Sequence, residues 1–327
     1  SAERSPDLPT QLGLEPFAPR FPWLNGDLQT LRDTLRPVPL PPQTGQPVVI
    51  DVGQGDQLLA LLDPPLPLGA SSRGLVLLMH GLAGSSDRGG LRRMGDTLQR
   101  AGFAILRLNM RGAGMGISLG GTKVLNALLA TEAERNAAGL DPAVPLLDGL
   151  VCISSPLDLQ ICSQQIERPR NRIYERWLLK RLIAQTLADP HGVGDAEREV
   201  LEGRVPQGPL ASIRAFDATI TAPRWGYASV EHYYREASPL PGLLALAEAN
   251  GVATTLPPAL IVHAEDDPWV PVASARQLQA AALPGVEVLL TPLGGHNGFH
   301  SQEDGPASRG GCWTDRLTAR WFKRLVA

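Results

Sequence analysis

The chain contains the stretch Met115-Gly116-Ile117-Ser118-Leu119-Gly120-Gly121, and a helix-like run over residues 122–130 follows it directly. A serine in the pattern G-x-S-x-G is typical of a tight turn between a strand and a helix. Side chains at Gly116 and Gly120 would collide in such a turn, so the backbone needs glycine at both positions. The turn sets the Ser118 hydroxyl at a helix N-terminus, where the dipole and free N–H groups favour a developing negative charge.

The pattern alone does not establish a reactive serine. A chain with 34 glycines can contain G-x-S-x-G by chance in a loop. A serine on this kind of turn works with an acid and then a histidine, which follow it in the chain on loops after late strands. The strand pattern and its loops therefore decide between the two interpretations.

Composition and charge are those of an ordinary globular protein. The chain has 327 residues, of which 43% are apolar and 19% charged, enough for one α/β domain with insertions or two small domains. The net charge of −3 argues against a nucleic-acid partner, because no basic excess exists to neutralise phosphates. No apolar run reaches the ~20 residues that span a membrane.

The three cysteines are Cys152, Cys162 and Cys312, which form no C-x-x-C pair and leave one over. They indicate neither a disulfide framework nor a zinc site. A reducing compartment is then the simpler assumption, and residues 1–7 lack the apolar segment of a secretion signal. We expect a cytoplasmic protein without a metal site. The chain does not begin with methionine, so removal of an N-terminal leader remains an alternative. Nothing in the sequence indicates an oligomeric state.

The apolar pattern predicts an α/β fold with a mostly parallel central sheet, helices on both faces and an inserted helical cap. Residues 1–47 are rich in proline and are expected to form an extended arm. A short hairpin should follow over 48–53 and 57–63. Runs typical of buried strands occur at 75–79, 103–109, 149–154, 259–263 and 286–291. The core should therefore comprise 48–154 and 259–327.

Residues 155–258 interrupt the alternation with helical spacing and little strand character, and we interpret them as the cap. A helix over 171–184 would place Ile173, Trp177 and Ala184 on one stripe, with Leu178 and Leu182 beside it. This helix region is also the most basic of the chain, with Arg168, Arg170, Arg172, Arg176, Lys180 and Arg181. A solvated helix face is favoured over contact with anionic lipid, because charge runs usually face water.

One junction conflicts with this fold. After the strand that ends near Asn109, only Met110 to Met115 precede Gly116. Parallel strands need a crossover of about a dozen or more residues, usually a helix, and the turn also lacks an apolar strand that leads into it. We therefore expect that a strand and a helix are absent between Gly114 and Met115.

Two loops after late strands carry the expected partners of Ser118. The first is Ala264-Glu-Asp-Asp-Pro-Trp-Val-Pro271, in which Asp267 precedes proline and Asp266 is better placed to secure the turn. The second is Pro292-Leu-Gly-Gly-His-Asn-Gly-Phe299, which holds His296 after two glycines. Alone, Asp267 could be a turn residue and His296 an ordinary loop histidine. Their order after Ser118, each at a strand end, favours a Ser-Asp-His triad.

An oxyanion formed at Ser118 would need two backbone N–H groups aimed at one point. The glycine-rich stretch 80–86 follows the first central strand, and its Leu82 N–H is the first candidate donor. The Leu119 N–H, directly after the serine, is the second. His80 and Gly81 would support this loop, as Gly116, Gly120 and Gly121 would support the turn.

These residues together resemble the α/β-hydrolases, and within them the YheT-like, embryogenesis-associated branch that includes the mammalian abhydrolase lipases. The resemblance covers most of residues 20–325. It rests on residues 21–30 (Phe-Pro-Trp-Leu-Asn-Gly-Asp-Leu-Gln-Thr), 80–86, 109–114, 216–223, 226–229, 233–234 and 266–271. It implies Ser118, Asp267 and His296 as the triad and carboxylic-ester hydrolysis as the usual activity. The missing crossover and Thr122, where asparagine is expected, depart from the pattern.

We therefore expect a carboxylic ester hydrolase that acts through an acyl-enzyme on a small-molecule ester and needs no cofactor. Thioester, amide, lactone or peroxide chemistry on the same fold is the alternative, as is a non-catalytic binding protein. The cap holds most of the few aromatic residues, which either pack it on the core or wall an acyl pocket. A pocket predicts short to medium acyl esters over acetyl-only or charged substrates.

Overall fold

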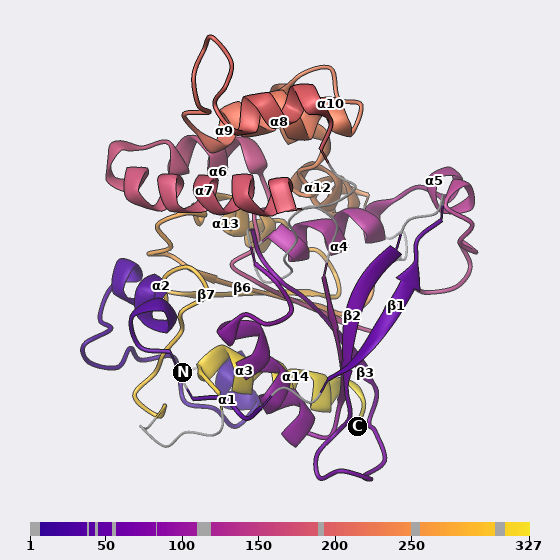
Figure 1. Cartoon of the computed structure of the whole chain (residues 1–327). Coiled ribbons are helices and arrows are strands. Elements are labelled where there is room, and N and C mark those ends of the chain that lie inside the picture. Colours follow the sequence, from indigo (N-terminus) through magenta and orange to yellow (C-terminus); the bar gives the residue numbers. More distant parts are fainter. Residues whose placement is uncertain are drawn as a thin grey trace.

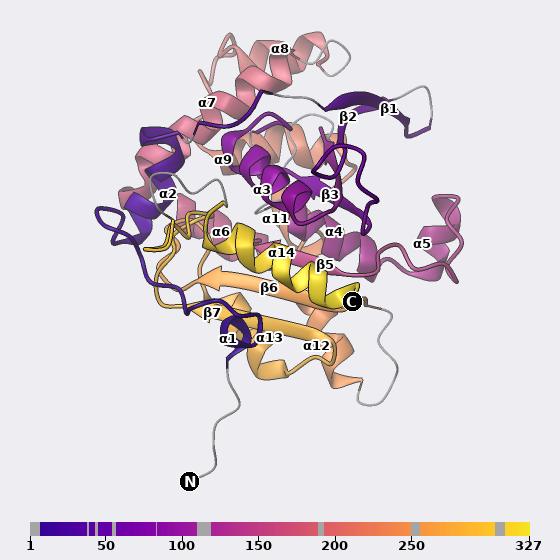
Figure 2. The same cartoon turned by 90° about the horizontal axis from the view of Figure 1, so that it is seen from below.

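The computed structural model describes residues 7–37, 39–42, 45–53, 57–82, 84–109, 119–188, 193–249, 256–304 and 311–327. Ser118, Gly116 and the expected deletion between Gly114 and Met115 lie in the stretch 110–118, outside the described residues. Figures 1 and 2 show two groups of strands with helices on both sides, so the predicted α/β class is confirmed.

The first sheet has the order β1-β2-β4-β3. It consists of β1 (Gln46–Asp51), β2 (Gln57–Asp63), β3 (Leu75–Met79) and β4 (Ala104–Leu108). Strands β1 and β2 pair antiparallel, which confirms the predicted hairpin, and β3 pairs with β4 in parallel. The second sheet has the order β5-β6-β7, and all its pairs are parallel. It consists of β5 (Leu150–Ile153), β6 (Ala259–Ala264) and β7 (Val286–Thr291).

The two sheets do not pair with each other in the part of the chain that the structure describes. Strand β3 is at the edge of the first sheet and β5 is at the edge of the second. In chain order, α4 (Leu119–Leu129) is the first element after β4 within the described residues, and the expected missing crossover lies before it, outside those residues.

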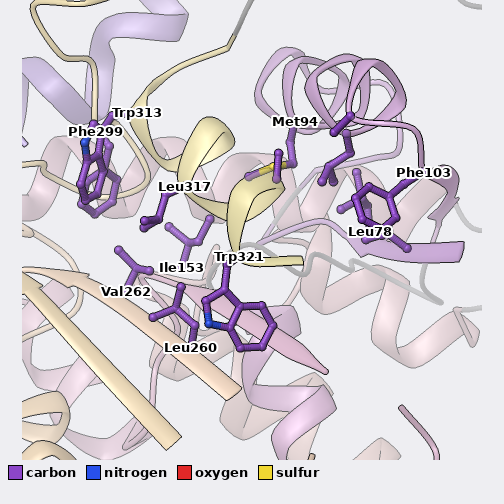
Figure 3. Packing of buried hydrophobic residues seen from close by; sticks show 14 of the residues in the cluster. Leu78, Met94, Phe103, Ile153, Leu260, Val262, Phe299, Trp313, Leu317 and Trp321 are labelled. Carbon is purple, nitrogen blue, oxygen red and sulfur yellow. The ribbon is translucent and has the colours of Figure 1, made fainter. Parts of the chain in front are cut away.

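The core lies on both faces of β6, whose side chains alternate between two clusters because strand residues point to opposite faces in turn. Leu260 and Val262 pack with α3 (Gly89–Arg100) and α14 (Trp313–Leu325). Figure 3 shows Leu317 and Trp321 of α14 pointing toward these two residues. On the other face, Ala259 and Ile261 pack with α4, α12 (Leu240–Glu248) and α13 (Ala273–Ala281).

The N-terminal region is not extended throughout, contrary to the expectation for residues 1–47. It contains the short helix α1 (Leu8–Gln11) and the longer helix α2 (Gly26–Leu35). Helix α2 begins where the Asn25 side chain accepts a hydrogen bond from the Leu28 N–H at 2.9 Å. The prolines lie outside this helix, so they do not interrupt it.

Between β5 and β6 the described residues form helices and no strand, and Figure 1 shows most of these helices at the top of the view. The helices before α12 are α6 (Leu159–Ile166), α7 (Arg172–Ala188), α8 (Asp195–Leu201), α9 (Ile213–Phe216), α10 (Ala222–Arg224) and α11 (Val230–Glu236). A 3-10 turn spans Pro169–Asn171 and a π-helix spans Asp217–Thr221. The remaining helix, α5 (Glu132–Ala137), precedes β5.

The cap helices have a small apolar core of their own, which includes Leu178, Leu182, Phe216 and Ile220. The predicted stripe of α7 faces solvent instead, because Ile173 is 82% exposed and Trp177 is 45% exposed. The residues beside that stripe are thus the ones that pack inward. No helix within the described ranges is both long and apolar enough to cross a bilayer.

Candidate active site

The loops after β6 and β7 bring Asp267 and His296 together. An Oδ2 oxygen of Asp267 lies 2.8 Å from the His296 Nδ1, and both side chains are buried. The other oxygen, Oδ1, accepts hydrogen bonds from the N–H groups of Trp269 and Val270 at 2.8 and 2.9 Å. One oxygen therefore holds the loop and the other orients the imidazole, which leaves the His296 Nε2 for a reaction partner.

The charge of Asp267 is balanced within the site. Burial alone would raise the pKa of Asp267, but the His296 ring, by charge and hydrogen bond, and His263 lower it below the ordinary value. The Trp269 ring lies over His296, with 4.5 Å between ring centroids. The carboxylate thus stays ionised and fixed, which stabilises an imidazolium at His296.

The neighbouring acids have other partners. Asp266 Oδ1 accepts a hydrogen bond from the Gly295 N–H at 2.8 Å and so ties the acid loop to the histidine loop. Glu265 forms an exposed ion pair with Arg276. Of the three adjacent acids, only Asp267 meets the expected contact of about 3.2 Å or less with the His296 ring.

The backbone around His296 is unusual. Gly295, Asn297 and Phe299 all have positive φ angles, of 61°, 61° and 48°. A Cβ at Gly295 would also collide with the Gly26 carbonyl oxygen of helix α2. Positive φ in non-glycine residues is costly and persists where surrounding contacts enforce it. The histidine loop is therefore held in a conformation that depends on helix α2.

Helix α2 braces this loop with polar contacts that the sequence did not reveal. The Thr30 hydroxyl oxygen accepts a hydrogen bond from the His296 N–H at 2.8 Å and donates one to the Gly26 carbonyl at 2.6 Å. The Gln29 side chain accepts from the His300 N–H and donates to the His300 carbonyl. Both residues lie in the stretch 21–30 that carries the family resemblance, which is the only signal that could have pointed to them.

His300 and His80 do not occupy the place of a base. His300 Nε2 lies 3.2 Å from Asp33 of α2, and His300 is not among the residues that line the cavity described below. His80 is 2% exposed. Burial, with Lys123 and Arg88 nearby, lowers the pKa of His80 to about 3, which keeps it neutral.

A cavity of about 190 Å³ lies between the sheet ends and the cap. Gly81, Leu82, Leu119 and His296 all line it, so the predicted oxyanion residues and the histidine share one space. The rest of the lining includes Leu159, Ile166, Leu178, Ile213 and Val270. The structure therefore joins a histidine–carboxylate pair to a mostly apolar pocket, the usual character of a small-ligand site.

Glycines at the start of α4 allow close packing beside this cavity. Gly120 and Gly121 are buried in the first turn. A Cβ at Gly121 would collide with the Ser155 hydroxyl of the loop after β5, so this position needs glycine. Helix α4 can thus approach the end of the second sheet, with Leu119 beside the cavity.

No family model matches the chain, but curated relatives do. It is 36% identical over 190 residues to the putative esterase YheT of Escherichia coli, an alignment that covers 57% of this chain and 48% of that protein. It is 30% identical over 287 residues to the phospholipase ABHD3 of Mus musculus, covering 79% and 64%. Identity to the medium-chain fatty acid ethyl ester synthase/esterase 2 of Saccharomyces cerevisiae is 23% over 299 residues, covering 77% and 62%. The chain thus spans about half to two thirds of the length of these relatives.

A solved structure supports the same fold. The carboxyl esterase 2 of the fungus Tuber melanosporum aligns over 92% of this chain and 98% of its own, with a TM-score of 0.51 and 17% identity. These relatives and this structure show that the chain has the fold of the α/β-hydrolase superfamily. The predicted resemblance to the YheT-like branch of this superfamily is confirmed by the relatives named YheT and ABHD3.

Proposed function

We propose that this α/β-hydrolase cleaves carboxylic esters with Ser118 as nucleophile, His296 as base and Asp267 as the acid that orients it. The observation that supports this most is the 2.8 Å contact between Asp267 and His296 at the wall of a cavity. Relatives named esterase and phospholipase support the same reaction class.

The mechanism follows from these proposed roles. Ser118 Oγ attacks the ester carbonyl carbon while His296 Nε2 takes the hydroxyl proton, and Asp267 stabilises the imidazolium through Nδ1. The N–H groups of Leu82 and Leu119 donate hydrogen bonds to the carbonyl oxygen as it becomes negative. The imidazolium returns the proton to the leaving alcohol, and an acyl-enzyme remains. His296 then deprotonates a water, which releases the acid and restores Ser118.

The cavity supports a preference for short to medium acyl chains. We assign residues 155–258 as the cap that walls it, since Leu159, Ile166, Leu178 and Ile213 come from this segment. Each methylene buried against such a wall contributes about 0.8 kcal/mol to binding. A bounded cavity of about 190 Å³ limits how many methylenes can gain this contribution.

A fluorophosphonate probe and a series of p-nitrophenyl esters test this function. The probe should label the wild type on Ser118 and leave Ser118→Ala unlabelled, whereas labelling at another residue would move the site. The value of kcat/KM should rise over the first few acyl carbons and then fall. A flat response from acetate to dodecanoate would remove the bounded pocket, and faster turnover of matched thioesters or amides would change the reaction class.

A further inference from the structure

The mostly apolar cavity is also lined by residues whose polar atoms lack partners among the described residues. Trp269 and Asn297 both line it. The Trp269 Nε1 and the Asn297 Oδ1 are buried and have no hydrogen-bond partner in the part of the chain that the structure describes. A buried polar atom without a partner is destabilising, and such an atom calls for an explanation such as a bound ligand.

A carboxylate also faces this cavity from the cap. Asp217 lines it and begins the π-helix Asp217–Thr221, a rare element that often occurs at functional sites. Its two oxygens accept hydrogen bonds from the Thr221 hydroxyl at 2.7 Å and the Tyr234 hydroxyl at 2.8 Å. Both donors are neutral, so neither balances the charge of the carboxylate.

No cationic side chain pairs with Asp217 within the described ranges of the chain. Arg214 forms an ion pair with the exposed Glu231 instead, and its guanidinium carbon lies 5.8 Å from the centroid of the Tyr234 ring. Burial raises the pKa of Asp217 to about 6, although Thr221 and Tyr234 oppose the rise. The carboxylate therefore stays mostly ionised at neutral pH, without a counter-ion.

Aromatic rings complete this corner of the cavity. Tyr233 and Tyr234 both line it, and their ring centroids are 5.4 Å apart. Aromatic faces attract cations, most strongly when the cation has left water, and rings of this kind recognise quaternary ammonium groups. Two hydroxyl groups already donate hydrogen bonds to Asp217 without balancing its charge. A cation between the carboxylate and these rings would therefore be a better further partner than another neutral hydroxyl.

We propose that the cavity binds esters that carry an ammonium group, with Asp217 and the rings of Tyr233 and Tyr234 as its recognition site. The hydrolytic part of this proposal rests on the proposed function. It also refines the expectation that charged substrates are disfavoured: the uncompensated carboxylate excludes anionic substrates, whereas a cationic group supplies the missing charge.

Two pairs of isosteric esters test the proposal. The first is butyrylcholine and 3,3-dimethylbutyl butyrate, which places the cation in the alcohol. The second is the ethyl ester of 4-(trimethylammonio)butyrate and ethyl 5,5-dimethylhexanoate, which places it in the acyl chain. In at least one pair the cationic ester should have a kcat/KM at least about tenfold above that of its neutral partner. Asp217→Asn should bring this ratio close to one.

Glu236→Gln is the matched control, because it removes one negative charge from α11 at an exposed position outside the cavity. This variant should keep the wild-type ratio. A ratio near one in both ester pairs for the wild type would overturn the ammonium site and leave the esterase proposal standing. A ratio that Asp217→Asn does not change would also overturn it.

A binding measurement separates this site from catalysis. Calorimetry should show that pentyltrimethylammonium binds the wild type at least about tenfold more tightly than it binds Asp217→Asn. If none of the four esters is hydrolysed but this difference appears, the proposed function fails and the ammonium site remains. Equal binding to both forms would overturn the site whatever the esterase result.

Discussion

Asp217 lines the cavity, whereas Asp267 lies behind it and contacts His296, which lines it; these two carboxylates have opposite kinds of partners. Asp267 has His296 and two backbone N–H groups as partners, and its pKa is lowered. Asp217 has two neutral hydroxyl partners, and its pKa is raised to about 6. Among the described residues, Asp267 thus has a histidine and backbone donors as partners, whereas Asp217 has no cationic partner.

The largest effect is expected for His296, the partner of Asp267. His296→Ala should lower kcat by about 10⁴-fold or more, because it removes the group that takes and returns the serine proton. His300→Ala is the matched control, since His300 contacts Asp33 and lies away from the cavity. Steady-state kinetics with a p-nitrophenyl ester should show a loss below about tenfold per folded molecule for this variant. Equal losses would make the assignment of the base wrong.

The two adjacent aspartates provide the next comparison. Asp267→Asn keeps the shape of the side chain but loses the charge that orients His296, so kcat should fall by about 10³–10⁴-fold. Asp266→Asn alters contacts to backbone N–H groups, that of Gly295 among them, and none to the His296 ring, so it should cost less than about tenfold. If the two variants lost activity equally, the direct contact of Asp267 with His296 would not explain its role.

A smaller effect is expected for Thr30, which positions His296 through the backbone. Thr30→Val removes the hydroxyl that accepts from the His296 N–H, and kcat should fall by about tenfold while KM stays near the wild-type value. Thr30→Ser restores the hydroxyl and should restore kcat. The activity should be measured at a temperature where both variants are folded. If Thr30 had only a structural role, Thr30→Val would lower the melting temperature, and Thr30→Ser would not restore kcat.

The last effect concerns stability rather than turnover. The folded state holds a proton on Asp217 more tightly than the unfolded state does, so its contribution to stability falls as pH rises from about 4 through 6. A rise in pKa from 3.8 to about 6 corresponds to about 3 kcal/mol at most. Asp217→Asn should therefore gain stability relative to the wild type on going from pH 4.5 to pH 8.

Urea unfolding at the two pH values measures this gain in stability. The change can be assigned to Asp217 because the groups around it keep their charge between these pH values. Tyr233, Tyr234 and Arg214 are the titratable or charged groups beside it, and none of them changes charge in this range. The contribution of Asp267 to stability changes with pH in the opposite direction. Its lowered pKa stabilises the fold at neutral pH, and this stabilisation is lost in acid. An unchanged pH dependence in Asp217→Asn would show that this carboxylate is not strained by burial.

The sequence by itself determined the fold class and the meeting of Asp267 with His296. Apolar runs of strand length gave the parallel strands, and neighbouring parallel strands bring their carboxyl ends to one edge of a sheet. Residues that directly follow β6 and β7 are therefore close in space without any further information. The motif G-x-S-x-G and the chain order of the three residues pointed to the superfamily that the relatives confirm.

Only the tertiary structure decided what surrounds that pair. The Thr30 contact joins residues 266 positions apart, and no local pattern encodes a pairing at such a separation. The helical period of α7 predicted a stripe with Ile173 and Trp177, but packing in the cap core buries Leu178 and Leu182 beside that stripe instead. Asp217 is one of many acids in the sequence, and its place at the cavity follows from the π-helix and from Tyr234, which only the folded cap brings together.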